Sequence, residues 1–145
     1  MPSKLGIHAI LPAETLSVIE RLMDSGARMP TVKAVAAIGW LKEVKALDPE
    51  IVTIGRFIDG VNRDINVEMP SLKGDLRENA RRVMDNLLLL WDEHRDYVDY
   101  WEIINELDPV GTEGHRRLAE FMIHCIEIAD AAGYRLGLFS YSLGV

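Results

Sequence analysis

The chain has 145 residues, of which 48% are hydrophobic and 27% are charged, the size and balance of one globular domain with a sizeable core. Its net charge of −7 argues against nucleic acid or an anionic membrane surface as a partner, because both are negatively charged. A single cysteine, Cys125, excludes a disulfide framework or a thiolate metal site within the chain, and its apolar helical surroundings predict a packing role. No stretch has the length of a membrane span or the pattern of a signal peptide, so we expect a cytoplasmic location for the chain as given.

Short apolar runs alternate with helical patterns along the first half of the sequence. The runs are rich in β-branched or small residues, which is typical of strands. The segments between them carry apolar residues at helical spacing, and Ser25-Gly26 closes the first of these like a glycine C-cap. We therefore expect strands at residues 4–11, 31–38 and 51–57, with helices at 13–24 and 41–47 between them.

Residues 58–75 form a long connection after the third expected strand and contain several glycine, asparagine and aspartate residues. The segment is longer than a plain connection needs, so it is either a functional loop or a flexible insertion. Helical periodicity returns after it. The expected elements of the second half are helices at 76–98 and 114–132 and strands at 100–106 and 135–142.

Strict alternation of strands and helices, with near-continuous apolar strands, predicts a parallel sheet covered by helices. A doubly wound sheet would usually show a glycine-rich phosphate loop after the first strand, and residues 8–13 (HAILPA) are nothing like one. A (β/α)8 barrel of the TIM type fits better, but it needs eight units and about 250 residues. We therefore expect residues 1–145 to be the N-terminal part of a single barrel domain, with strands 1–5 and helices 1–4.

The most informative stretch is residues 100–109, YWEIINELDP. An apolar run ends abruptly in Asn105-Glu106, so polar groups stand where the fourth strand leaves the core. Two-residue alternation places Glu102 and Glu106 on one face, with Glu106 at the carboxyl end, where α/β folds bind ligands. By itself the pair is equally consistent with a turn residue followed by a solvated acid, and Asp108 with an Asp-Pro turn.

Asn-Glu at the end of a fourth strand resembles the clan A glycoside hydrolases, a (β/α)8-barrel superfamily that includes cellulases, mannanases and β-galactosidases. The resemblance implies that Glu106 is a general acid/base and that Asn105 hydrogen-bonds the sugar 2-hydroxyl. It further implies hydrolysis, with retention, of O-glycosidic bonds in a β-linked oligo- or polysaccharide. A proton donor of this kind needs a raised pKa, which burial and a second carboxylate would supply.

Two features depart from the family pattern. The clan often has an arginine on its second strand, whereas the nearest candidate here is Arg56, at the end of the third. The nucleophilic glutamate of strand seven has no counterpart, so the chain alone is expected to be inactive.

Other strand exits carry residues suited to a sugar site. His8 and Arg56 fit a hydroxyl contact and a carboxylate contact respectively. Trp40 is either a stacking platform for a sugar ring or a cap on the hydrophobic core. Tyr141, after the fifth strand, is a possible rim contact. Glu102, lower on its strand, is expected to pair with a cation in the barrel floor.

Alternatives of other classes remain at this point. A non-catalytic carbohydrate-binding or interaction barrel would have the same cleft without a nucleophile. A different barrel enzyme should show a strand-end lysine or metal-spaced histidines, but Lys33 is placed at the start of its strand and the histidines are irregularly spaced. No metal or cofactor is therefore expected, and bare barrel edges predict an oligomer.

Overall fold

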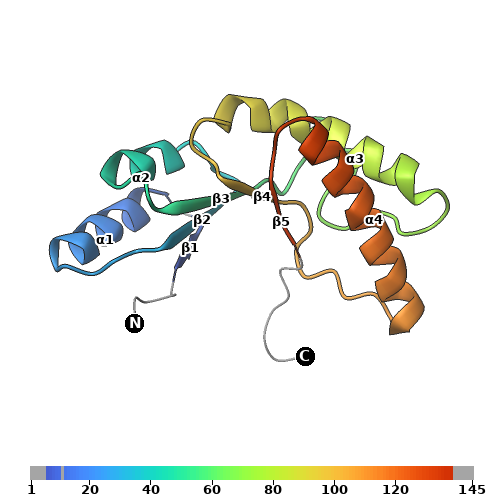
Figure 1. Cartoon of the computed structure of the whole chain (residues 1–145), viewed down its shortest axis with the longest axis horizontal. Helices are drawn as coiled ribbons and strands as arrows, with labels where there is room; N and C mark the ends of the chain where they lie inside the picture. Colours follow the sequence, from blue (N-terminus) through green and yellow to red (C-terminus); the bar gives the residue numbers. More distant parts are fainter. Residues whose placement is uncertain (1–5, 11, 139–145) are drawn as a thin grey trace.

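The computed structural model of the protein describes residues 6–10 and 12–138 (Figure 1). Within them, strands and helices alternate as expected for an α/β chain, with a 3-10 turn inserted after the third helix. The strands are β1 (Ile7–Ala9), β2 (Thr31–Val35), β3 (Val52–Arg56), β4 (Tyr100–Glu102) and β5 (Leu136–Gly137). The helices are α1 (Pro12–Asp24), α2 (Leu41–Leu47), α3 (Leu76–Trp91), the 3-10 turn η1 (Asp92–His94) and α4 (Gly111–Ala131).

The five strands form one sheet in the order β1-β2-β3-β4-β5, and every neighbouring pair is parallel. Each strand therefore lies beside the next one in the chain, without the reversal of order that marks a doubly wound sheet. When all crossover connections between consecutive strands are right-handed, the connecting helices lie on the same side of the sheet. Figure 1 shows α1 and α2 beside one end of the sheet and α3 and α4 beside the other.

The two faces of the sheet differ in chemistry. Side chains on the helix side, such as Val32, Ala34 and Trp101, are fully buried in the hydrophobic core. On the opposite face, Lys33 lies in register between His8 and Ile54, and Ile54 is paired in turn with Tyr100. Alternation adds two more residues to this face. We call it the polar face, and its members are His8, Lys33, Ile54, Arg56, Tyr100 and Glu102.

The core beneath β3 and β4 is built around two stacked indoles. The rings of Trp91 and Trp101 are 4.9 Å apart at their centroids and within 8° of parallel. Gly55, which pairs with Trp101 across the sheet, leaves room for this ring, because a Cβ atom there would lie 2.7 Å from its Cζ3 atom. The glycine in the third strand is thus required by packing rather than by backbone conformation.

Asp99 joins the amino-terminal ends of β3 and β4. One oxygen of its carboxylate accepts hydrogen bonds from Lys45 Nζ at 2.6 Å and from the amide of Thr53 at 2.8 Å. Partial burial would raise the pKa of Asp99, but the bonds from Lys45 and Thr53 outweigh burial and hold this pKa below its ordinary value. The network fixes the end of the sheet opposite the candidate site.

Several element ends differ from the sequence-based expectation. The helix expected at residues 76–98 ends at Trp91, because the polar run after it has no apolar stripe to bury and tightens into η1. The strands expected at residues 31–38, 51–57 and 100–106 were too long, since apolar residues continue into the core beyond the hydrogen-bonded pairs. Residues 4, 5, 11 and 139–142 of the first and fifth expected strands lie outside the described residues. The expected glycine cap is confirmed, since Gly26 has a left-handed backbone just past its helix, and Gly133 has the same conformation after α4.

Candidate functional site

Glu106 stands beyond the carboxyl end of β4, directly after Asn105, which forms a single β-bridge. Ile103, two residues after the buried Trp101, is 1% exposed, and Ile104 packs against the core, so the alternating pattern continues past Glu102. That Glu106 shares the face of Glu102 stays a prediction. Asn105 is half-buried, whereas Glu106 is exposed and its side chain bonds to no described residue.

The backbone of Glu106 is left-handed, with φ at 51°. Such a conformation costs a non-glycine residue about 1–2 kcal/mol. Ala36, just past β2, has φ at 65°. These are the two left-handed residues other than glycine among those described, and each follows the carboxyl end of a strand. Both strained residues thus lie past the carboxyl ends of strands, where α/β folds place their functional sites.

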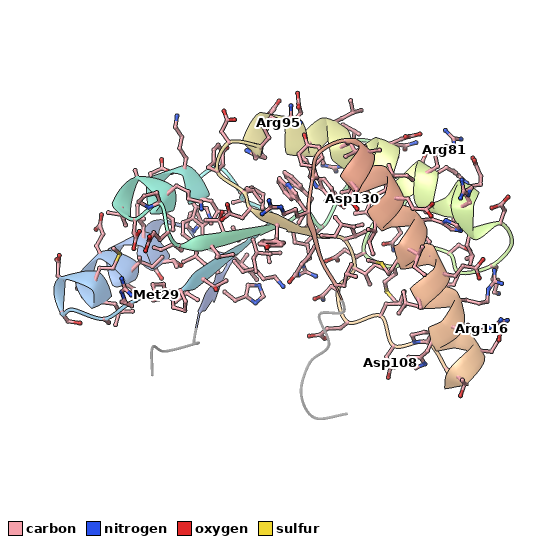
Figure 2. All side chains as sticks on the ribbon, in the orientation of Figure 1. Met29, Arg81, Arg95, Asp108, Arg116 and Asp130 are labelled. Carbon is pink, nitrogen blue, oxygen red and sulfur yellow. The ribbon has the colours of Figure 1, made fainter. Side chains whose placement is uncertain are left out.

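A histidine ties the segment that follows Glu106 to the first turn of α4. His115 Nε2 lies 3.1 Å from a carboxylate oxygen of Asp108, and its Nδ1 lies 3.0 Å from the carbonyl oxygen of Gly111. The Gly111 carbonyl accepts the hydrogen bond from Nδ1, and Asp108 is the ion-pair partner of the same ring. Pro109 also packs closely on Gly114, where a Cβ atom would come within 2.9 Å of the proline Cβ. Figure 2 shows Asp108 beside the start of α4.

On the polar face, Glu102 forms an ion pair with Lys33, whose side chain is 16% exposed against 10% for Glu102. The expected cation partner of Glu102 is therefore confirmed, and Lys33 lies in the middle of β2 rather than at its start. His8 is the register neighbour of Lys33. Partial burial, and then the charges of Lys33 and Arg56, lower the pKa of His8, against the opposing effect of Glu102. A neutral imidazole at pH 7 can both donate and accept a hydrogen bond.

Arg56 ends β3 and is 5% exposed. Its Nη1 lies 3.0 Å from a carboxylate oxygen of Glu68, which comes from the segment between β3 and α3. Neither its Nε nor its Nη1 donates a hydrogen bond to a described residue. The carboxylate contact expected of Arg56 is thus made within the chain as an ion pair with Glu68, and both of these nitrogens keep hydrogen-bonding capacity.

The remaining sequence-based candidates are scattered. Trp40 is 9% exposed and belongs to the hydrophobic core, so it caps the core and is not an open stacking platform. Tyr141 lies outside the described residues. His8 and Arg56 share the polar face, while Glu106 lies past its end.

Sequence reasoning missed two residues of this region. Glu68 carries no motif and reaches Arg56 only because the long connection folds back on the sheet. His115 gives a weak local signal, since it stands four residues after Gly111 on the helix that follows Asp-Pro.

Cysteine and metal chemistry find no support in the described part of the chain. Burial raises the pKa of the Cys125 thiol to about 12, as expected of a packing residue. No group of three or more histidine, cysteine, aspartate or glutamate side chains is gathered at metal-binding distance among residues 6–10 and 12–138. None of the described helices combines the length and apolarity needed to cross a bilayer.

Comparison with known proteins gave no match, either to a protein family model, to a curated protein or to a solved structure.

Proposed function

We propose that the chain supplies the first five strands of a (β/α)8 barrel of the clan A glycoside hydrolase type and that Glu106 is its general acid/base. The reaction would be hydrolysis, with retention, of O-glycosidic bonds in a β-linked oligo- or polysaccharide. One observation carries the proposal: Asn105-Glu106 follows the fourth of five consecutively ordered parallel strands, with a strained backbone at Glu106. Barrels keep consecutive strand order and take catalytic residues from the carboxyl ends of strands.

The chemistry requires two carboxyl groups about 5–5.5 Å apart on opposite sides of the anomeric carbon. Glu106 would protonate the leaving oxygen, and Asn105 beside it would hydrogen-bond the 2-hydroxyl as the ring flattens. The nucleophilic carboxylate would come from a later strand of the barrel. His8, as a neutral imidazole on the polar face, is suited to a hydroxyl contact.

A non-catalytic carbohydrate-binding barrel is the second candidate. It is favoured by one observation, the exposure of Glu106 without a side-chain partner among the described residues. Neighbouring groups normally set the pKa of a catalytic proton donor, whereas a residue that only binds sugar needs no such neighbours.

The test compares Glu106→Gln with Glu113→Gln, an exposed acid on α4, in a protein that contains all eight strands. On a substrate with a poor leaving group, Glu106→Gln should lower kcat/KM by about 10²–10⁴-fold. A dinitrophenyl glycoside, which needs little protonation, should show a smaller loss, and azide should restore turnover. Glu113→Gln should leave both rates unchanged.

Turnover of Glu106→Gln within tenfold of wild type on the poor leaving group would overturn the assignment. A wild-type protein that binds oligosaccharides without cleaving any would favour the second candidate.

A further inference from the structure

The connection between β3 and α3 is held by a dense set of hydrogen bonds, although it contains no helix or strand. Asn86 Oδ1 accepts from the amide of Asn62 at 2.7 Å, and Arg117 donates to the carbonyl oxygens of Leu72 and Gly74 at 2.6 and 2.8 Å. Val67, in the middle of the connection, is fully buried. Of the two alternatives raised by the sequence, these contacts favour an ordered loop over a flexible insertion, and an ordered loop of this length is typically functional.

This loop and the first two turns of α3 enclose a hollow of about 300 Å³. We call it the loop hollow, lined by residues 64–66, 69–71, 79, 82 and 83. Its volume is at the lower end of the range of small-molecule sites, about 300–1,000 Å³.

Two asparagines hold the wall of the loop hollow in place. Each forms hydrogen bonds through only one of the two polar atoms of its side-chain amide. Asn66 Oδ1 accepts from the amides of Glu68 and Met69 at 3.1 and 2.8 Å. Asn79 Nδ2 donates to the carbonyl oxygens of Ser71 and Lys73 at 2.9 and 2.8 Å. The amide nitrogen of Asn66 and the amide oxygen of Asn79 have no partner among the described residues, so one donor and one acceptor remain.

Two opposite charges line the same hollow without pairing. Neither the Asp64 carboxylate nor the Arg82 guanidinium forms a side-chain hydrogen bond or an ion pair with a described residue. The adjacent Arg81 forms ion pairs with Glu78 and Asp85. These two acids on α3 are therefore already paired with Arg81. Asp64 and Arg82 are therefore free to bond a ligand.

We propose that the loop hollow binds one pyranose residue of a neutral carbohydrate, as a site separate from Glu106. A carboxylate, a guanidinium and the two free amide ends offer the mixture of acceptors and donors that vicinal hydroxyls need. Asp64 and Arg82 are the charged residues of the lining and have opposite signs, so the hollow has no net charge to attract a simple anion or cation. Ile65 and the largely exposed Met69 supply apolar surface for the C–H face of the ring.

The experiment is a saturation-transfer NMR titration of the full chain, which tolerates oligomers. The probes are the methyl β-D-glycosides of glucose, xylose and mannose, and inorganic phosphate is a competitor. At least one glycoside should bind with a millimolar Kd, which is typical of a ligand with so few atoms. Arg82→Gln and Asp64→Asn should each weaken that binding at least fivefold. Arg81→Gln, one position along the same helix, should not change it, since Arg81 projects outward from α3 (Figure 2).

Three results would overturn the proposal: no transfer to any glycoside at 50 mM (roughly ten times such a Kd), transfer that is equal in Arg82→Gln and wild type, or displacement of the sugar by phosphate. Glu106→Gln should bind the probes like wild type, so failure of the hydrolase proposal and failure of this one are distinguishable.

Discussion

Removing one partner of the Lys33–Glu102 ion pair should destabilise the chain much more than removing both. The two side chains are only 16% and 10% exposed, so a charge left without its partner would be largely shielded from water. Breaking a buried pair costs about 3–5 kcal/mol, and the residual exposure lowers our expectation to about 2–4 kcal/mol for Lys33→Met or Glu102→Leu. The double variant, which buries no charge, should lie within about 1 kcal/mol of wild type.

The assay is a double-mutant cycle from urea denaturation at pH 7, followed by circular dichroism and tryptophan fluorescence. The exposed pair Arg116–Glu113, whose side chains are 72% and 65% exposed, is the matched control and should show a coupling below about 1 kcal/mol. Single variants within about 0.5 kcal/mol of wild type, or a double variant as unstable as the sum of the singles, would refute the reasoning. Either result would mean that water reaches the polar face at Lys33 and Glu102.

Three contacts around the sheet give further measurable outcomes. Gly55→Ala should cost about 1–3 kcal/mol, because its Cβ atom would overlap the ring of Trp101; an unchanged urea midpoint would contradict this packing. Because the folded pKa of Asp99 lies below its unfolded value, its carboxylate stabilises the fold at higher pH, and that contribution is lost as pH falls through the folded pKa. In Asp99→Asn this part of the acid dependence, measured as urea midpoints between about pH 5 and pH 2, should vanish, and Lys45→Met should reduce it. His115→Ala should speed amide exchange in residues 104–110 while changing global stability by less than about 1 kcal/mol, and unchanged exchange would show that the imidazole does not hold the loop.

Local signals explain which parts of the fold were predictable. The 3.6-residue apolar period and the glycines after α1 and α4 predicted the ends of these helices to within a few residues. Helix caps and apolar stripes depend only on residues that are close in the sequence. Strand ends were not predictable, because pairing depends on the partner strand. Ile103 and Ile104 are apolar like strand residues, yet β4 ends before them, and the core buries Ile103 fully and Ile104 partly.

The candidate site was predictable only in part for the same reason. The partner of Glu102 was expected as a cation, but its identity as Lys33 depends on the register of β2 against two other strands. The sequence did not show whether Trp40 is a core residue or a stacking platform, because a tryptophan after a strand gives the same local pattern in both roles. The Arg56–Glu68 pair joins residues whose proximity is set by a folded-back loop.

Most of the left-handed residues that the structure describes are glycines, and Glu106 is one of the two exceptions. Among residues 6–10 and 12–138, four glycines adopt left-handed backbones, at residues 26, 74, 111 and 133, each at a turn or helix end where a side chain is not needed. At Glu106 the same backbone conformation is held by a residue that is strained in it, at a cost of about 1–2 kcal/mol. Its side chain forms no bond with a described residue that would offset this cost. Ala36 has the same conformation after β2 without a polar side chain, so our proposal for Glu106 depends on its place after the fourth strand as well as on the strain.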